Sequence, residues 1–109
     1  MPRDYKVYVD DVLTSIHKIK VYTKGLSKKR FLGDEKTIDA VVRNLEIIGE
    51  AINNIPEEIR SRYPNVEWRK ISGLRNILVH EYFGIDTEII WDIVRNKIPE
   101  LEKEIRKIR

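Results

Sequence analysis

Apolar side chains recur at spacings of three and four residues along most of the chain, and this is the period of an α-helix. Residues 4–22 carry one such stripe, which predicts a first helix ending near Gly25. The members of this stripe are Val9, Val12, Leu13, Ile16, Ile19 and Tyr22. The following residues up to Asp34 are predicted to form a loop, anchored to the core by Phe31 and Leu32.

The best-defined helical pattern lies between Glu35 and Asn54. Its apolar positions are Ile38, Val41, Val42, Leu45, Ile48 and Ile52. Asp34 directly precedes this helix and is its predicted N-cap. Gly49 lies inside the helix, where glycine costs about 1 kcal/mol relative to alanine. We therefore expect another segment, such as a neighbouring helix, to approach the backbone of Gly49 closely.

Shorter elements follow this helix. Pro56 suits the first turn of a short helix that runs to Arg62, because the missing N–H of proline is harmless there. Residues 63–65, Tyr-Pro-Asn, break the chain. A helix from about Glu67 is predicted to continue into residues 75–84, with Ile71, Leu74 and Leu78 as the stripe that faces the core.

The last third of the chain begins with a predicted turn at residues 83–85, after which Asp86 or Thr87 caps a further helix. Pro99 is expected to kink or restart that helix. No segment shows the period of two that indicates a strand. The pattern predicts an all-α fold: a bundle of four to five helices in which short connections make successive helices antiparallel, with residues 1–109 as a single domain.

The amino-acid composition excludes some classes of protein and of binding site but does not indicate a particular function. Charged residues make up 36% of the chain, yet the formal net charge is only +3, so acids and bases are interspersed. Cysteine is absent, which excludes disulfides and cysteine zinc sites and fits a reducing compartment. The absence of long apolar runs predicts a cytoplasmic protein with no membrane association. The abundance of Ile, Lys, Arg and Glu hints at a thermophilic source.

Candidate chemistry is concentrated in residues 75–84, R-N-I-L-V-H-E-Y-F-G. On an ideal helix, about 140° separates Arg75 from His80, whereas Arg75 and Tyr82 lie within about 20° of each other. Asn76 lies one turn before His80. Arg75 and His80 can converge on one target only if the helix loosens near His80 or if a second chain contributes.

A purely structural interpretation of this segment stays open. His80 would then interact with the negative end of the helix dipole, Tyr82 and Phe83 would form an apolar lid, and Arg75 would be a surface residue. The second histidine, His17, has no polar cluster around it in the sequence. We therefore expect His17 to be a partly exposed residue of the first helix.

If residues 75–82 do form a site, phosphodiester chemistry fits them best. The chain has no glycine-rich phosphate loop and no metal-ligand spacing, so we expect neither a metal nor a cofactor. Histidine transfers protons near neutral pH, and arginine stabilises charge on phosphoryl oxygens. Cleavage of RNA needs a general acid and a general base, and a two-fold dimer would supply two copies of His80.

The sequence also resembles a known family. Arg75–Tyr82 match the R-x-x-x-x-H-x-Y signature of HEPN-domain proteins. The blocks R-N-L-E-I-I-G-E-A (43–51) and R-Y-P-N-V-E-W-R-K-I-S-G-L-R-N (62–76) resemble the DUF86, or HepT-like, branch. This resemblance implies a HEPN-like helical bundle that forms a homodimer through its motif helices, and a toxin that acts as a metal-independent endoribonuclease.

The resemblance also implies roles for individual residues. Arg75 and His80 would be the catalytic pair, and Asn76 would support them. The usual partner of such a toxin is a minimal nucleotidyltransferase antitoxin, and Tyr82 is the position that it would modify with AMP. An added adenylyl phosphate would repel RNA from the cleft. The alternative is a non-catalytic helical dimer in which the motif serves as a binding or modification surface for such a partner.

Two further groups of charged residues have open roles. Glu46 and Glu50 lie on the same predicted helix as Gly49 and could line the cleft or hold Arg75, or could be ordinary exposed charges. The basic run Lys28, Lys29 and Arg30 could bind RNA phosphates or could simply be solvated.

Overall fold

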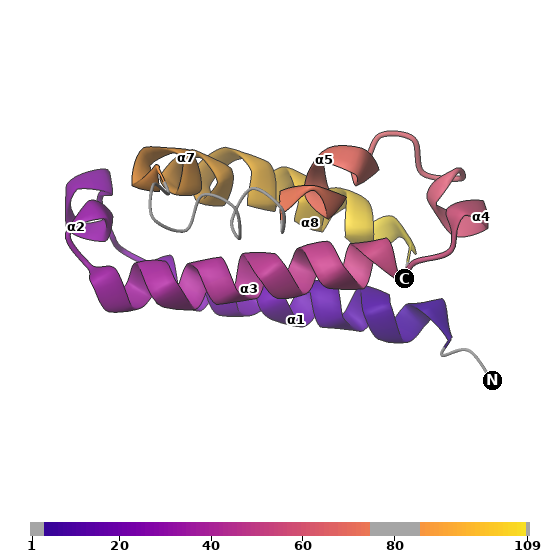
Figure 1. Cartoon of the computed structure of the whole chain (residues 1–109), viewed down its shortest axis with the longest axis horizontal. Helices are drawn as coiled ribbons and strands as arrows, with labels where there is room; N and C mark the ends of the chain where they lie inside the picture. The colour runs from indigo at the N-terminus through magenta and orange to yellow at the C-terminus, as the bar shows by residue number, and fades with distance from the viewer. Residues whose placement is uncertain (1–3, 75–85, 109) are drawn as a thin grey trace.

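The computed structural model describes residues 4–74 and 86–108, and the motif that begins at Arg75 lies outside them. All regular structure in the described ranges is helical, with no strand, so the predicted all-α class is confirmed (Figure 1). The described residues form seven α-helices and one π-helical turn. This exceeds the expected four to five helices because three of the helices contain only four or five residues.

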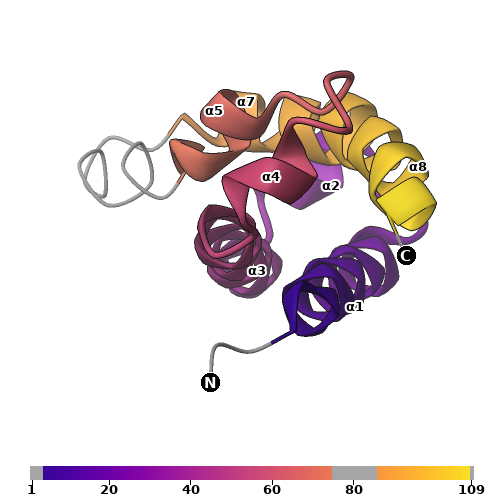
Figure 2. The same cartoon turned by 90° about the vertical axis from the view of Figure 1, so that its right-hand side faces the viewer.

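Helices α1 (Tyr5–Thr23) and α3 (Glu35–Asn53) pack side by side in opposite directions and form one layer of the molecule (Figures 1 and 2). Their inward faces are the predicted stripes. The residues without solvent exposure are Val9, Val12, Ile16, Ile19, Val41, Leu45, Ile48 and Ile52. Tyr22 was wrongly included in the first stripe: it lies in the last turn of α1 and is 41% exposed. His17 is exposed on α1.

The segment predicted to be a loop contains a short helix, α2 (Lys28–Leu32), so that expectation was wrong. Gly25, with a φ of 76°, makes the turn after α1, and the Ser27 side chain accepts a hydrogen bond from the backbone N–H of Arg30. The predicted anchoring is confirmed for Phe31, which is fully buried and packs against Trp91 with ring centroids 5.0 Å apart. Five residues are too few to establish helical periodicity in a sequence.

Helix α3 begins as predicted. Asp34 is its N-cap: one carboxylate oxygen accepts the backbone N–H of Thr37 at 3.1 Å, and the other accepts the Thr37 hydroxyl at 2.7 Å. These hydrogen bonds, side chain first and backbone second, lower the pKa of Asp34 below its ordinary value. Gly49 is buried within α3, and the close approach of another segment to its backbone stays a prediction.

Helices α4 (Glu57–Arg60) and α5 (Trp68–Ser72) lie above α3 and contain no buried residue. Pro56 is the residue before α4 and not part of its first turn, which moves the predicted start by one residue. The chain break at residues 63–65 is confirmed, and the Trp68 indole N–H donates to the Tyr63 carbonyl across it at 2.9 Å. The helix expected from about Glu67 is present as α5, which ends at Ser72, and after a turn at Gly73 the chain is again helical at Leu74. Its predicted continuation into residues 75–84 lies outside the described residues.

The remaining helices form one path along the top of the molecule in Figure 1: α7 (Thr87–Asp92), the π-helical turn η1 (Ile93–Lys97) and α8 (Ile98–Ile108). Asp86 caps α7, as predicted, by accepting the backbone N–H of Glu88 at 2.9 Å. Pro99 is the second residue of α8, which begins directly after the π-helical turn, so the regular α-helix restarts where the sequence predicted a kink or restart. Lys20 on α1 pairs with Glu102 on α8 at 3.0 Å.

The π-helical turn also keeps the buried stripe of this path in phase. Ile90, Val94 and Ile98 are all buried and lie four residues apart. On a regular α-helix, eight residues would rotate the stripe by about 80°. The wider turn removes much of this rotation, so the three side chains reach the same core.

None of the described helices is long and apolar enough to cross a membrane.

Candidate functional site

The predicted site residues Arg75, Asn76, His80 and Tyr82 all lie in residues 75–85, outside the described part of the chain. The structure instead describes both ends of this segment, at Leu74 and at Asp86, and the helices that hold them. The contacts of these flanking helices determine where the motif segment begins and ends in the fold.

At the first end, α5 is attached to the end of α3. The Ser72 hydroxyl donates to the Asn53 side-chain oxygen at 3.2 Å, two residues before Leu74. The Trp68 hydrogen bond to Tyr63 fixes the start of the same helix. Trp68 and Ile71 of α5 are partly buried against the core, so apolar packing and these polar contacts together position the chain that enters the motif.

At the second end, Asp86 caps α7 while Lys28 on α2 pairs with Glu88 at 3.7 Å. Lys29 and Arg30 are exposed and form no ion pair with a described residue. The basic run therefore lies beside the helix that follows the motif, which is compatible with the predicted RNA contact. A role in RNA binding stays a prediction.

The two carboxylates considered for the cleft differ in exposure. Glu46 is partly buried on α3, and Glu50, one turn later, is exposed. Neither forms an ion pair within the described ranges. Their proposed contact with Arg75 stays a prediction, because Arg75 lies outside those ranges.

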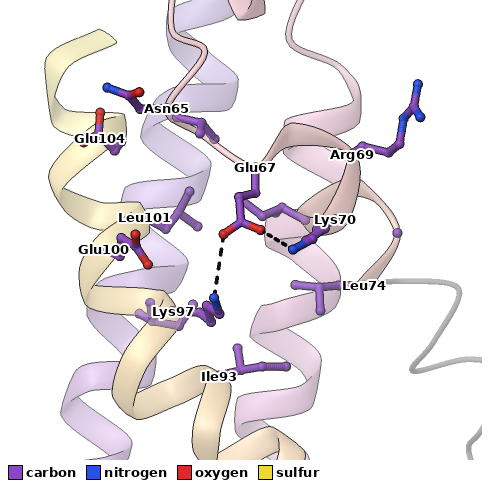
Figure 3. Close-up of a pocket in the computed structure, with 14 residues that line it drawn as sticks. Asn65, Glu67, Arg69, Lys70, Leu74, Ile93, Lys97, Glu100, Leu101 and Glu104 are labelled. Carbon is purple, nitrogen blue, oxygen red and sulfur yellow. Dashed lines mark ion pairs between the residues drawn. The ribbon is translucent and has the colours of Figure 1, made fainter.

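One hollow, of about 470 Å³, lies between α5, η1 and α8, and we call it the α5–α8 hollow (Figure 3). Its apolar wall is formed by Val66, Ile71, Leu74, Ile93, Ile98 and Leu101. Ile71 and Leu74, predicted to face the core, are partly buried and line this hollow. Its wall therefore favours apolar contact.

Most of the charge around the α5–α8 hollow is neutralised internally. Glu67 pairs with Lys70 at 2.9 Å and reaches Lys97 at 3.7 Å, so it links α5 to η1 (Figure 3). The hydrogen bond and charge of Lys70, with the charge of Lys97, lower the pKa of Glu67, and the same contact with Glu67 raises the pKa of Lys70. A carboxylate held ionised between two lysines is a poor proton donor at neutral pH.

A second hollow, of about 400 Å³, lies between α4 and α5, and we call it the α4–α5 hollow. Arg60 and Arg69 line it together with Trp68, Ser61 and Ser72. Arg69 also belongs to the lining of the α5–α8 hollow, and in Figure 3 the end of its side chain extends away from the other labelled residues. Two guanidinium groups, which are permanently charged donors, suit an anionic ligand.

No group of three or more His, Cys, Asp or Glu side chains is placed to hold a metal ion within residues 4–74 and 86–108. The described arrangement thus offers basic and apolar surfaces on either side of α5, next to a segment that carries the sequence's arginine and histidine motif.

Comparison with known proteins identifies the family. The profile described as Ribonuclease HepT-like matches residues 12–108. The chain belongs to the HepT-like ribonuclease family. This confirms the resemblance seen in the sequence, and the matched range includes the whole motif from Arg75 to Tyr82.

Two relatives align with nearly the whole of this HepT-like chain. A protein of Methanocaldococcus jannaschii named as a candidate RNase is 46% identical, over 99% of this chain and 90% of its own length. A protein of Thermococcus cleftensis named probable ribonuclease HepT is 39% identical, over 100% of this chain and 99% of its own. No solved structure matches the chain.

Sequence reasoning missed several polar residues of this HepT-like chain. Arg60 and Arg69 were not singled out, because they stand nine positions apart on either side of a chain break. Asn44 was also missed: it is buried on α3, donates to the Ala40 carbonyl at 2.9 Å, and its side-chain oxygen has no partner among the described residues. An asparagine inside an apolar stripe is the signal that could have identified it.

Proposed function

We propose that this protein is a metal-independent endoribonuclease, the toxin of a toxin and antitoxin pair, and that it cleaves RNA at a cleft shared by two chains of a homodimer. The observation that carries the proposal is membership of the HepT-like ribonuclease family over a range that includes an intact R-x-x-x-x-H-x-Y motif. The names of relatives, such as probable ribonuclease HepT, support the same activity.

The chemistry assigns a role to each motif residue. One His80 removes the proton from a ribose 2′-hydroxyl, whose oxygen attacks the adjacent phosphorus. The bond from phosphorus to the 5′-oxygen breaks, and the second His80 protonates that leaving oxygen. Arg75 stabilises the charge that develops on the phosphoryl oxygens, and Asn76 supports the site. The products are a 2′,3′-cyclic phosphate and a 5′-hydroxyl end.

The homodimer is part of this proposal for a geometric reason. About 140° separates Arg75 from His80 on an ideal helix, and one imidazole is half of an acid and base pair. Two motifs facing each other across a two-fold axis supply both histidines and both arginines. Glu46 and Glu50 on α3 are candidates to line the cleft.

Control of the activity is the second half of the proposal. A minimal nucleotidyltransferase antitoxin would transfer AMP to the Tyr82 hydroxyl. The added phosphate carries negative charge and bulk, and both would keep RNA away from Arg75. The alternative function is a non-catalytic dimer that only binds this partner and is modified by it.

The deciding experiment is RNA cleavage by the purified protein in the presence of EDTA. His80→Ala should abolish cleavage while the dimer persists in size-exclusion chromatography with light scattering. His17→Ala is the matched control, because it removes the other histidine, which is exposed on α1. Cleavage unchanged in His80→Ala would refute the assigned role. Modification of Tyr82 without cleavage of any RNA by the wild type would favour the alternative.

A further inference from the structure

We propose that the α4–α5 hollow is a second RNA contact outside the motif, in which Arg60 and Arg69 bind a backbone phosphate and Trp68 contacts the adjoining base. This inference deepens the proposed ribonuclease function and rests on it. It assigns to the chain a binding subsite for single-stranded RNA beside the segment that carries Arg75 and His80.

The two arginines are free to receive an anion. Neither Arg60 nor Arg69 forms an ion pair with any residue of the described ranges. Their neighbour Arg62, in contrast, is paired with Glu58 at 3.2 Å. Two unpaired guanidinium groups in one hollow repel each other, and a phosphate between them removes this repulsion and adds charge-assisted hydrogen bonds.

Arg60 has a further unsatisfied group. Its Nε–H is buried and has no hydrogen-bond acceptor. Buried donors in proteins are nearly always satisfied, and each exception needs an explanation. A phosphate oxygen in the hollow provides an acceptor after a small rotation of the guanidinium group.

The remaining walls suit a nucleotide. Trp68 is partly buried, and its indole N–H is already donated to Tyr63, which fixes the ring. Aromatic rings held in this way accept any base, because every base has a π-face. The hydroxyl protons of Ser61 and Ser72 are donated to Glu58 and Asn53, so the arginines supply the free donors.

Charge and size agree with this occupant. Among the described residues that line the hollow, Glu57 is the one carboxylate, and the two guanidinium groups outnumber it. The volume of about 400 Å³ lies within the usual range for small-ligand sites, roughly 300–1,000 Å³. The α5–α8 hollow differs, because it has an apolar wall and its central carboxylate is paired with two lysines.

The position of the hollow connects it to the proposed chemistry. Ser72 lines it and precedes Arg75 by three residues. Three residues of fully extended chain span at most about 11 Å, so the hollow lies close to the point at which the motif segment begins. A nucleotide bound in the α4–α5 hollow would therefore flank the scissile phosphate.

The test measures binding separately from cleavage. A fluorescent, 2′-O-methylated single-stranded RNA, which lacks the nucleophile, is titrated with the full chain and followed by anisotropy. Arg60→Ala/Arg69→Ala should weaken binding by about tenfold or more and lower the slope of log affinity against log salt by about one to two. The matched control is Arg43→Ala/Arg62→Ala, which also removes two positive charges and should bind nearly as the wild type does.

Additional variants make every outcome decisive. Arg69→Glu, at an exposed position, should weaken binding even if the double variant folds poorly. Equal losses in the control and the test pair would overturn the proposal. Excess AMP that displaces the RNA fully would indicate a mononucleotide site instead. His80→Ala is measured by cleavage, and Arg60→Ala/Arg69→Ala by binding of an RNA that cannot be cleaved, so failure of the catalytic proposal and failure of this one give different results.

The contact with the base has its own readout. In a Trp91→Phe background, Trp68 is the only tryptophan and its fluorescence should change when the RNA binds. This change should disappear in Arg60→Ala/Arg69→Ala at the same RNA concentration. A fluorescence signal that is unaffected by bound RNA would overturn the role of Trp68.

Discussion

The layer formed by α1 and α3 and the segment formed by α4 and α5 are stabilised in different ways. The two long helices bury a continuous apolar core, whereas α4 and α5 bury no residue. In the second region, partly buried side chains such as Ile59 and Ile71 pack against the edge of that core, and hydrogen bonds from Trp68 to Tyr63 and from Ser72 to Asn53 add to this contact. The part of the chain that leads into the motif thus combines partial apolar burial with a few polar contacts, and we expect local opening to require less free energy there than in the layer of α1 and α3.

The largest expected effect comes from the hydrophobic layer. Ile48→Ala removes a fully buried side chain from α3, and the cavity it leaves should lower the free energy of unfolding by about 3 kcal/mol. Urea denaturation at constant protein concentration measures this loss. Arg43→Ala, at an exposed position of the same helix, should change stability by no more than about 0.5 kcal/mol. Equal effects of the two variants would contradict the contrast.

A smaller and more local effect is expected in the second region. Trp68→Phe keeps an aromatic ring but removes the indole donor to the Tyr63 carbonyl, which then accepts only the backbone N–H of Val66 among the described residues. The loss of this hydrogen bond should cost about 1 kcal/mol. Hydrogen exchange should become faster for the amides of α5 and stay unchanged for those in the middle of α3. Uniform acceleration across both helices would show that the two regions open together.

Acid should weaken the start of α3 through Asp34. The pKa of Asp34 is lowered in the folded chain, so its contribution to stability is complete above the ordinary value of 3.8 and is lost as the pH falls through the folded value. Asp34→Asn keeps an N-cap without the charge and should lack this component. Urea midpoints of the two proteins should converge with falling pH, and a constant difference would contradict the assignment.

The smallest effect is expected for Glu67, whose pKa is lowered mainly by Lys70. Because its partners are exposed lysines, Glu67→Gln should change stability little at low salt and not at all in 1 M NaCl, where the Debye length is about 3 Å. The effect of Asp34→Asn rests on hydrogen bonds at close range and should persist in 1 M NaCl. The same salt sensitivity in both variants would argue against this distinction.

The elements that the sequence predicts well are those with long periodic stripes or caps. Helix α3 and its cap Asp34 follow directly from local pattern and local chemistry. Helix α2, with five residues, is below the length at which periodicity can be recognised. Tyr22 extends the stripe of α1 but lies beyond the region that α3 covers, since the pattern gives the face of a helix and not the extent of its neighbour.

The candidate site divides in the same way. Arg75 and His80 are recognised because their spacing is a family signature within one short segment. Arg60 and Arg69 meet only after the chain turns at residues 63–65, so tertiary structure was needed to bring them into one hollow. A motif of neighbouring residues can be recognised in the sequence, whereas a subsite formed by residues on both sides of a chain break can be recognised only in the folded structure.

The π-helical turn at residues 93–97 has a consequence for the evolution of the chain length. A wide turn of this kind accommodates one more residue than an α-helical turn, and it lies just before Pro99 in α8. Descendants of this chain that lose one residue between α7 and α8 could keep the faces of both helices directed as they are now. The continuous helical segment formed by α7, η1 and α8 should therefore tolerate the loss of one residue at positions 93–97.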